Sequence, residues 1–133
     1  MNALADVECF QATHNNSKIV IVGDLNCHHS NWLGSKDCNG NDKTNGAGIS
    51  CLELCLTLGL KNMVSGNTYL RNTGHAVSVL DLVLTDSPLL VKNVTLENPI
   101  GCSPHSVVSF KIDINTRVQK DYKRIRWQYH RAN

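Results

Sequence analysis

At 133 residues and 41% hydrophobic content, the chain can form one hydrophobic core but not two domains of ordinary size. No stretch approaches the roughly 18 apolar residues of a membrane helix, and the first residues lack the basic-then-apolar plan of a secretory signal. We therefore expect no membrane partner and an intracellular chain, nuclear or cytoplasmic. The net charge of +2 is small, so a strongly basic surface must be local.

The first expected elements alternate in type. Residues 2–12 read as a short helix, and residues 18–23, KIVIVG, read as a strand that is buried on both faces. Residues 34–46 form a polar loop rich in Gly and Asn. A helix that ends near Gly59 follows this loop. Its expected apolar face comprises Ile49, Leu52, Leu56 and Leu60.

Strands dominate the rest of the body. They are separated by Gly, Asn and Pro turns, and are expected at residues 60–64, 68–71, 77–85, 91–97 and 106–114. The order helix, strand, helix and then several strands indicates a mixed α/β layered domain over residues 1–116.

The last segment, residues 117–133, has a different composition. RVQKDYKRIRWQYHRAN carries six Lys/Arg against one Asp, a net +5, which leaves seven Lys/Arg against ten Asp/Glu, a net −3, for the body. Its basic residues alternate with Tyr122, Trp127 and Tyr129, a composition suited to phosphates and stacked bases. A solvated linker is the alternative interpretation.

The six cysteines show no paired spacing that would predict disulfides. Cys51 and Cys55 fall inside the apolar helical pattern, so small core residues in a reduced chain are the simplest interpretation. A zinc site is an alternative, with ligands from Cys27, His28, His29 and Cys38. Adjacent histidines rarely converge on one ion, and no Cys-x-x-Cys supports such a site.

Polar residues follow the first strand in the sequence GDLN. A buried strand holds its last residues rigidly at one edge of the sheet, so Asp24 and Asn26, two positions apart, are expected to point the same way. A carboxylate can orient a water molecule or accept its proton, and an amide can donate a hydrogen bond to an anionic oxygen. The same sequence is also good turn chemistry.

Two later segments strengthen the functional interpretation. SVLDLVLTD places Asp81 in the middle of an apolar strand, where an ionised carboxylate needs a partner. GCSPHSVVSF places His105 just before another apolar strand. A buried Asp that faces a His on a neighbouring strand orients the ring for work at a phosphate oxygen.

These motifs resemble the metal-dependent endonuclease/exonuclease/phosphatase superfamily, which includes deoxyribonuclease I. VGDLN, SVLDLVL and SPHSVVSF follow the order of its Gly-Asp-x-Asn, Ser-x-x-Asp and Ser-Asp-His motifs. NTYLRN and HHSNWLGS are similar to the endonuclease domain of non-LTR retrotransposons, and the basic end resembles the connector to their reverse transcriptase. The resemblance covers about residues 10–130. It implies the C-terminal half of a DNase I-like β-sandwich with flanking helices.

The resemblance also implies residue roles. Asp24 would position or deprotonate the attacking water, Asn26 would hold the scissile phosphate, and Asp81 would orient His105, which would stabilise the developing charge. The supporting hydrogen-bond groups near the phosphate would be Thr68, Ser78 and Ser103. The reaction would be Mg-assisted hydrolysis of a DNA phosphodiester, with the metal as Lewis acid. His28 and His29 match no catalytic position and would shape the surface beside the site.

The sequence departs from the family pattern in two ways. The family domain is nearly twice as long, and the unmatched half carries its metal-binding Glu. Pro104 stands where the family has the Asp of Ser-Asp-His, another residue of the metal site. We therefore assign no metal ligand and expect the chain to be inactive alone, with DNA as partner. A chain that supplies the absent half and self-association through an exposed sheet are further expectations; a non-catalytic binding fragment that acts through the basic tail is the alternative function.

Overall fold

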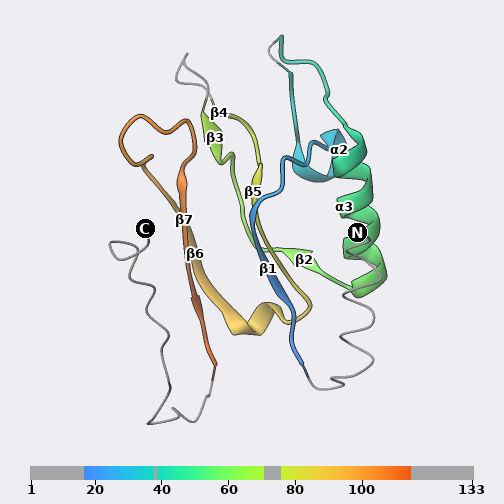
Figure 1. Ribbon diagram of the computed structural model, residues 1–133, viewed down its shortest axis with the longest axis vertical. Coiled ribbons are helices and arrows are strands. Elements are labelled where there is room, and N and C mark those ends of the chain that lie inside the picture. The colour runs from blue at the N-terminus through green and yellow to red at the C-terminus, as the bar shows by residue number, and fades with distance from the viewer. Residues whose placement is uncertain (1–16, 38, 71–75, 115–133) are drawn as a thin grey trace, which may run out of the picture.

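The computed structural model describes residues 17–37, 39–70 and 76–114 (Figure 1). The expected helix at residues 2–12 and the basic segment 117–133 lie outside the described residues. The mixed α/β prediction is confirmed. Figure 1 shows α3 on one side of a central sheet and the β6–β7 hairpin on the other. Among the described residues, no helix is long and apolar enough to cross a bilayer.

The central sheet is antiparallel and has the strand order β1-β5-β2. These strands are β1 (Val20–Asp24), β5 (Asp81–Thr85) and β2 (Lys61–Asn62). Two further hairpins pair β3 (Tyr69–Leu70) with β4 (Ala76–Ser78), and β6 (Val91–Glu97) with β7 (Val107–Ile112). The remaining elements are the helices α2 (Ser30–Leu33) and α3 (Gly46–Leu58) and the 3-10 turn η1 (Pro88–Leu90).

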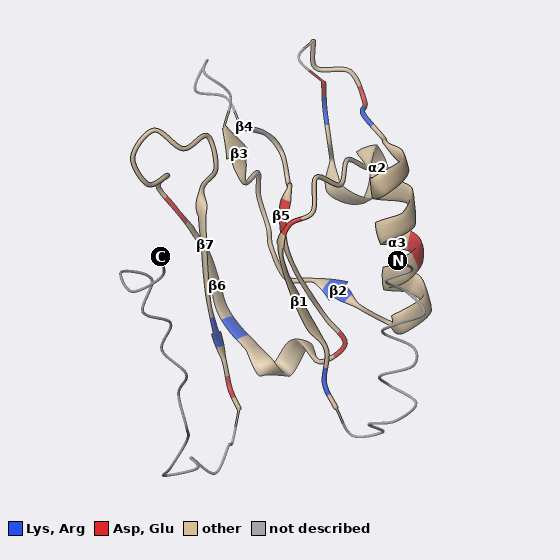
Figure 2. Ribbon diagram, viewed as in Figure 1, with Lys and Arg blue, Asp and Glu red and all other residues tan. Residues whose placement is uncertain are grey.

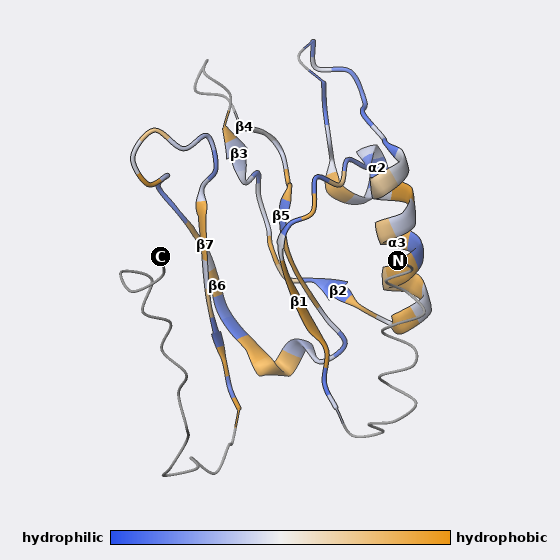
Figure 3. Cartoon of the chain, in the orientation of Figure 1, coloured by the Kyte–Doolittle hydropathy of each residue, from blue (hydrophilic) through white to orange (hydrophobic). Residues whose placement is uncertain are grey.

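The strand that is buried on both faces is β5, not the first strand as the sequence predicted. Leu82, Val83 and Leu84 of β5 are at most 2% exposed, because β1 and β2 flank this strand and the helix and hairpin layers cover its faces. Strand β1 lies at the edge of the sheet, and Val22 is 52% exposed. Figure 3 shows the apolar residues concentrated along β1 and β5.

Helix α3 forms as predicted but buries a different face. Asn45 caps its start by accepting a hydrogen bond from the Gly48 amide, and Gly59 ends it in the left-handed conformation with φ 64°. The predicted apolar face is wrong for Leu56, which is 74% exposed, and Ile49, which is 49% exposed, whereas Leu60 is buried as predicted.

The buried face of α3 consists of small residues because the helix lies close to the loop after β1. Its buried residues are Gly48, Cys51 and Cys55. A Cβ on Gly48 would lie 2.0 Å from the carbonyl oxygen of His28, so only glycine fits there. The polar segment that follows β1 is therefore in direct contact with the start of α3.

Candidate active site

Three of the predicted site residues meet at one end of the central sheet. Strand β1 ends at Asp24, strand β5 begins at Asp81, and the antiparallel register pairs these two residues. His105 precedes β7 and forms an isolated bridge with Tyr69. Figure 2 shows the acidic residues at the point where β1 ends and β5 begins. Asp81 therefore starts its strand. The sequence had indicated a position in the middle of the strand, and this prediction is wrong.

The His105 ring lies between two carboxylates. Its Nδ1 is 2.9 Å from Oδ2 of Asp81, and its Nε2 is 3.9 Å from Oδ2 of Asp24. An ionised carboxylate only accepts hydrogen bonds, so Nδ1 of His105 carries a proton and donates the hydrogen bond that Asp81 accepts. The side chains of His105, Asp81 and Asp24 are 29%, 21% and 37% exposed. Asp81 thus makes the closer contact with the ring, and both His105 and Asp24 are partly exposed.

Thr68 ties the segments of this site together. Its side chain is fully buried, and its hydroxyl oxygen accepts hydrogen bonds from the amides of Leu80 and Asp81, each at 2.9 Å. Its own amide donates to the carbonyl of Ser78, and its carbonyl accepts from the amide of Ser106. Thr68 therefore fixes the start of β5 and the approach to β7 at once.

Replacing Thr68 by Val should destabilise the fold by about 2–4 kcal/mol, because the isosteric change leaves two buried N–H groups without an acceptor. Urea unfolding monitored by circular dichroism measures the change. Thr95→Val is the matched control, since Thr95 is exposed on β6, and it should change the free energy of unfolding by less than about 0.5 kcal/mol. Equal losses in the two variants would contradict the tying role of Thr68.

Asn26 is near the site but not in the way that strand periodicity predicted. The strand ends at Asp24, and Asn26 adopts the left-handed conformation with φ 49°. Its backbone amide donates to Oδ1 of Asp24 at 3.0 Å, so the turn interpretation of GDLN describes the local structure. The two side chains therefore do not follow the alternation of an extended strand. The Asn45 amide group donates to the Asn26 carbonyl and holds this turn against α3.

The segment before His105 supplies two backbone contacts. The Ser103 hydroxyl accepts a hydrogen bond from the His105 amide at 3.1 Å. The Pro104 carbonyl accepts one from the amide of Leu70. An open cavity of about 420 Å³ lies beside this segment, with Tyr69, Ser103 and Pro104 among its lining residues. The Tyr69 and His105 rings meet edge to face, with centroids 5.1 Å apart.

Sequence reasoning missed how closely His28 is connected to this site. Its Nδ1 lies 3.3 Å from the hydroxyl oxygen of Ser78, which is buried, and its Nε2 lies 3.0 Å from Nζ of Lys43. Burial and then the positive charge of Lys43 lower the pKa of His28 below its ordinary 6.5, while Asp24 acts in the opposite direction. These partners are 15 and 50 residues away in sequence, so no local signal could have shown them.

The cysteines near the site are core residues, as predicted. Cys27, Cys51 and Cys55 are buried free thiols, whereas Cys102 is exposed. Burial, followed by the neighbouring Cys51, raises the pKa of Cys27 to about 12. Its thiol donates to the carbonyls of Leu25 and Ala47. Among the described residues, which do not include Cys38, no group of three or more His, Cys, Asp or Glu side chains could hold the zinc ion of the alternative interpretation.

A thiol reagent at pH 8 should modify Cys102 rapidly and Cys27 only after unfolding. With a pKa of about 12, only about 1 in 10,000 Cys27 thiols is ionised at that pH, and the thiolate is the reactive form. Iodoacetamide labelling with and without urea, read by peptide mass spectrometry, measures both sites in one sample. Rapid labelling of Cys27 in the folded chain would contradict the buried arrangement.

The described residues do not fit a bound metal by themselves. Among residues 17–37, 39–70 and 76–114, no group of three or more His, Cys, Asp or Glu side chains could hold an ion. Asp24 Oδ1 already accepts the Asn26 amide and Asp81 Oδ2 already accepts His105. Magnesium requires several oxygen ligands in near-octahedral geometry, so further ligands would have to come from elsewhere.

Comparison with known proteins identifies the family. The endonuclease-reverse transcriptase family matches residues 3–109. The chain belongs to this family. A search of curated proteins found no match.

A solved structure shows the same fold. The chain is similar to the endonuclease domain of TRAS1, a telomere-specific non-LTR retrotransposon, with a TM-score of 0.61 and 18% sequence identity. The match covers 85% of this chain and 51% of the TRAS1 domain, so this endonuclease-reverse transcriptase relative spans about half the length of that domain. The expectation of a partial DNase I-like α/β sandwich is confirmed.

Proposed function

We propose that this chain carries part of the phosphodiester-hydrolysing site of a retrotransposon-type endonuclease that acts on DNA. The observation that carries the proposal is the His105 ring, held by Asp81 on one side and directed toward Asp24 on the other. A histidine held by a carboxylate can donate a proton or a hydrogen bond at a fixed position. The description of the chain's family, endonuclease-reverse transcriptase, supports hydrolysis of a nucleic-acid phosphodiester.

Each residue has a role in this proposal. Asp24 orients the attacking water or accepts its proton, and Asn26 donates a hydrogen bond to the scissile phosphate. His105 stabilises the negative charge that develops on the phosphate, and Asp81 holds the ring in position.

The three supporting residues act in different ways. Thr68 is fully buried and Ser78 is 1% exposed, so we assign them to positioning and not to direct contact with a phosphate. Ser103 is exposed beside the cavity next to His105 and is the supporting residue that a phosphate can reach.

We further propose that these 133 residues alone do not nick DNA. The described residues lack a group of three metal-binding side chains, and Pro104 contributes only a backbone carbonyl where a carboxylate would bind metal. The absence of such a group supports an incomplete metal site. Plasmid nicking by the purified chain, with and without magnesium, tests this proposal, and no nicking is expected.

The free edge of the central sheet supports a place for a complementary chain. Strand β1 is hydrogen-bonded to β5 on one side, and its other side is open among the described residues. Val22 is exposed there and lines a cavity of about 270 Å³ together with Val108 and Phe110. An unpaired edge with an apolar surface favours association with another chain, either the other half of the domain or a second copy.

A second candidate function is DNA binding without catalysis through residues 117–133. The specific observation is the charge of this segment, six Lys/Arg against one Asp. Basic side chains interleaved with aromatic ones bind phosphates and bases without sequence preference. The two candidates differ in whether the chain acquires nicking activity when the other half of the domain is supplied.

A further inference from the structure

A chain of three polar side chains lies on the flank of the candidate active site. Nζ of Lys43 is 3.0 Å from Nε2 of His28, and Nδ1 of the same ring is 3.3 Å from the Ser78 hydroxyl oxygen. Lys43 is exposed, His28 is half-buried and Ser78 is buried. The chain thus leads from the surface to the base of the site.

The ammonium group of Lys43 contacts a ring nitrogen of His28. A lysine ammonium only donates hydrogen bonds, so Nε2 of His28 must accept, and the ring is neutral with its proton on Nδ1, donated to Ser78. The lowered pKa of His28 agrees with a neutral ring. By contrast, Lys36 and Lys92 are paired with the carboxylates of Asp42 and Asp113.

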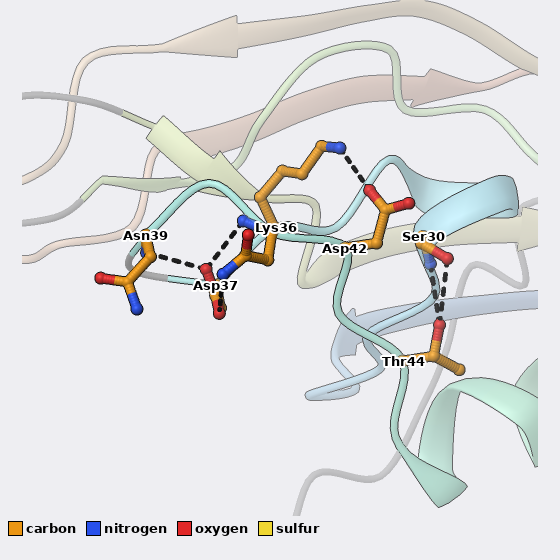
Figure 4. A network of polar contacts seen from close by, with 7 residues as sticks. Ser30, Lys36, Asp37, Asn39, Asp42 and Thr44 are labelled. Carbon is orange, nitrogen blue, oxygen red and sulfur yellow. Dashed lines mark hydrogen bonds and ion pairs between the residues drawn. The ribbon is translucent and has the colours of Figure 1, made fainter.

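The loop that carries Lys43 is held in place by its own polar contacts (Figure 4). Lys36 pairs with Asp42 across the loop, and the Asp37 carboxylate accepts the amides of Asn39 and Asn41. The ends of the loop are fixed as well. Its last part is joined to α2 because the Thr44 hydroxyl accepts the Ser30 amide. A lysine on such a loop loses less freedom when it binds.

Hydrogen bonds connect His28 to the residues proposed for catalysis. The Asn45 side chain accepts the His28 amide and donates to the Asn26 carbonyl. The Ser78 carbonyl accepts the amide of Thr68, whose hydroxyl holds Asp81. Lys43 is therefore attached, through His28, to the same hydrogen-bonded framework as Asn26 and Asp81.

We propose that Lys43, held by His28, binds a backbone phosphate of the DNA strand next to the phosphate at His105. The inference rests on the proposed function, because it takes His105 as the site of the scissile phosphate. The site itself presents two carboxylates, Asp24 and Asp81, which repel a polyanion. A fixed cation beside them offsets this repulsion, and Lys43 has ammonium hydrogens left for a phosphate oxygen after one bonds His28.

Binding of a fluorescein-labelled 20-base-pair DNA duplex to the full chain tests the proposal, measured by fluorescence anisotropy between about 50 and 200 mM salt. Lys43→Ala should raise Kd roughly threefold to tenfold and lower the slope of log K against log salt by about 0.9, the value for one lost phosphate contact. Lys92→Ala is the matched control, since it removes the same charge from β6, outside the loop that carries Lys43. It should change neither quantity.

Further variants separate charge from structure. Lys43→Arg should restore most of the affinity, and Lys43→Gln should behave as Lys43→Ala does while keeping most of the side-chain length. A Lys43→Ala slope equal to that of Lys92→Ala overturns the inference. A completed domain is this chain joined to the other half of an endonuclease domain. If it nicks DNA while Lys43→Ala leaves the slope of log K against log salt unchanged, this inference alone is overturned. A Lys43-dependent slope without nicking in any completed domain would overturn the proposed function alone.

Discussion

Supercoiled plasmid incubated with the 133-residue chain and magnesium should stay intact, whereas a chimera that joins the chain, with Pro104→Asp, to the unmatched part of the TRAS1 endonuclease domain should nick it. The chain supplies Asp24, Asp81 and His105 in contact, but its described residues contain no group of three metal-binding side chains. Agarose electrophoresis of nicked and supercoiled plasmid measures both reactions. Nicking by the chain alone would show that a ligand set has been overlooked.

Substitutions in the chimera assign the activity to these residues. Asp24→Ala and His105→Ala should each lower the nicking rate by about 100-fold or more, the typical contribution of a proton-transfer or charge-stabilising group. Asp86→Ala is a suitable control, because Asp86 lies at the far end of β5 and accepts the Ile19 amide there. A chimera that nicks equally well with Asp24→Ala and His105→Ala would place the chemistry elsewhere.

Deletion of residues 117–133 should abolish detectable DNA binding at about 100 mM salt. The deletion removes a net charge of +5 and leaves a body with seven Lys/Arg against ten Asp/Glu, so a single lysine contact cannot offset the general repulsion of DNA. Anisotropy titrations of the full and shortened chains measure this loss.

A control for the deletion keeps the length and removes the charge. Replacing all six Lys/Arg of residues 117–133 by Gln should abolish binding as the deletion does. Trp127→Ala alone should weaken binding by roughly 5-fold to 150-fold, since stacking contributes about 1–3 kcal/mol per base. Binding that survives the deletion would move the main contact surface to the sheet edge beside His105.

Much of the architecture could be predicted because it depends on local patterns. The strand at 91–97 has the predicted bounds, and α3 ends before Gly59 as predicted, because turn and cap residues act on their neighbours. The face that α3 buries could not be predicted from periodicity. Contact between Gly48 and the His28 backbone selects small residues for that face, and this contact depends on the tertiary fold.

The candidate site shows the same division. The pairing of Asp81 with His105 was predicted from the need of a carboxylate in an apolar strand for a partner, although Asp81 lies at the start of its strand and not in the middle. For Asn26 the turn alternative holds and the strand alternation does not, because the strand ends two residues earlier. The connection of His28 to Ser78 and Lys43 depends on how the loops pack, and no periodic pattern in the sequence indicates this packing.

The hydrogen bonds of Thr68 have a consequence for how the site opens. The amides of Leu80, Asp81 and Ser106 all donate to this one residue, although they belong to segments that are far apart in the chain. In hydrogen exchange, such amides lose protection together, since displacement of Thr68 releases all three. The aspartate and the segment that leads to the histidine are thus parts of one cooperative unit, and the site is either assembled or open as a whole.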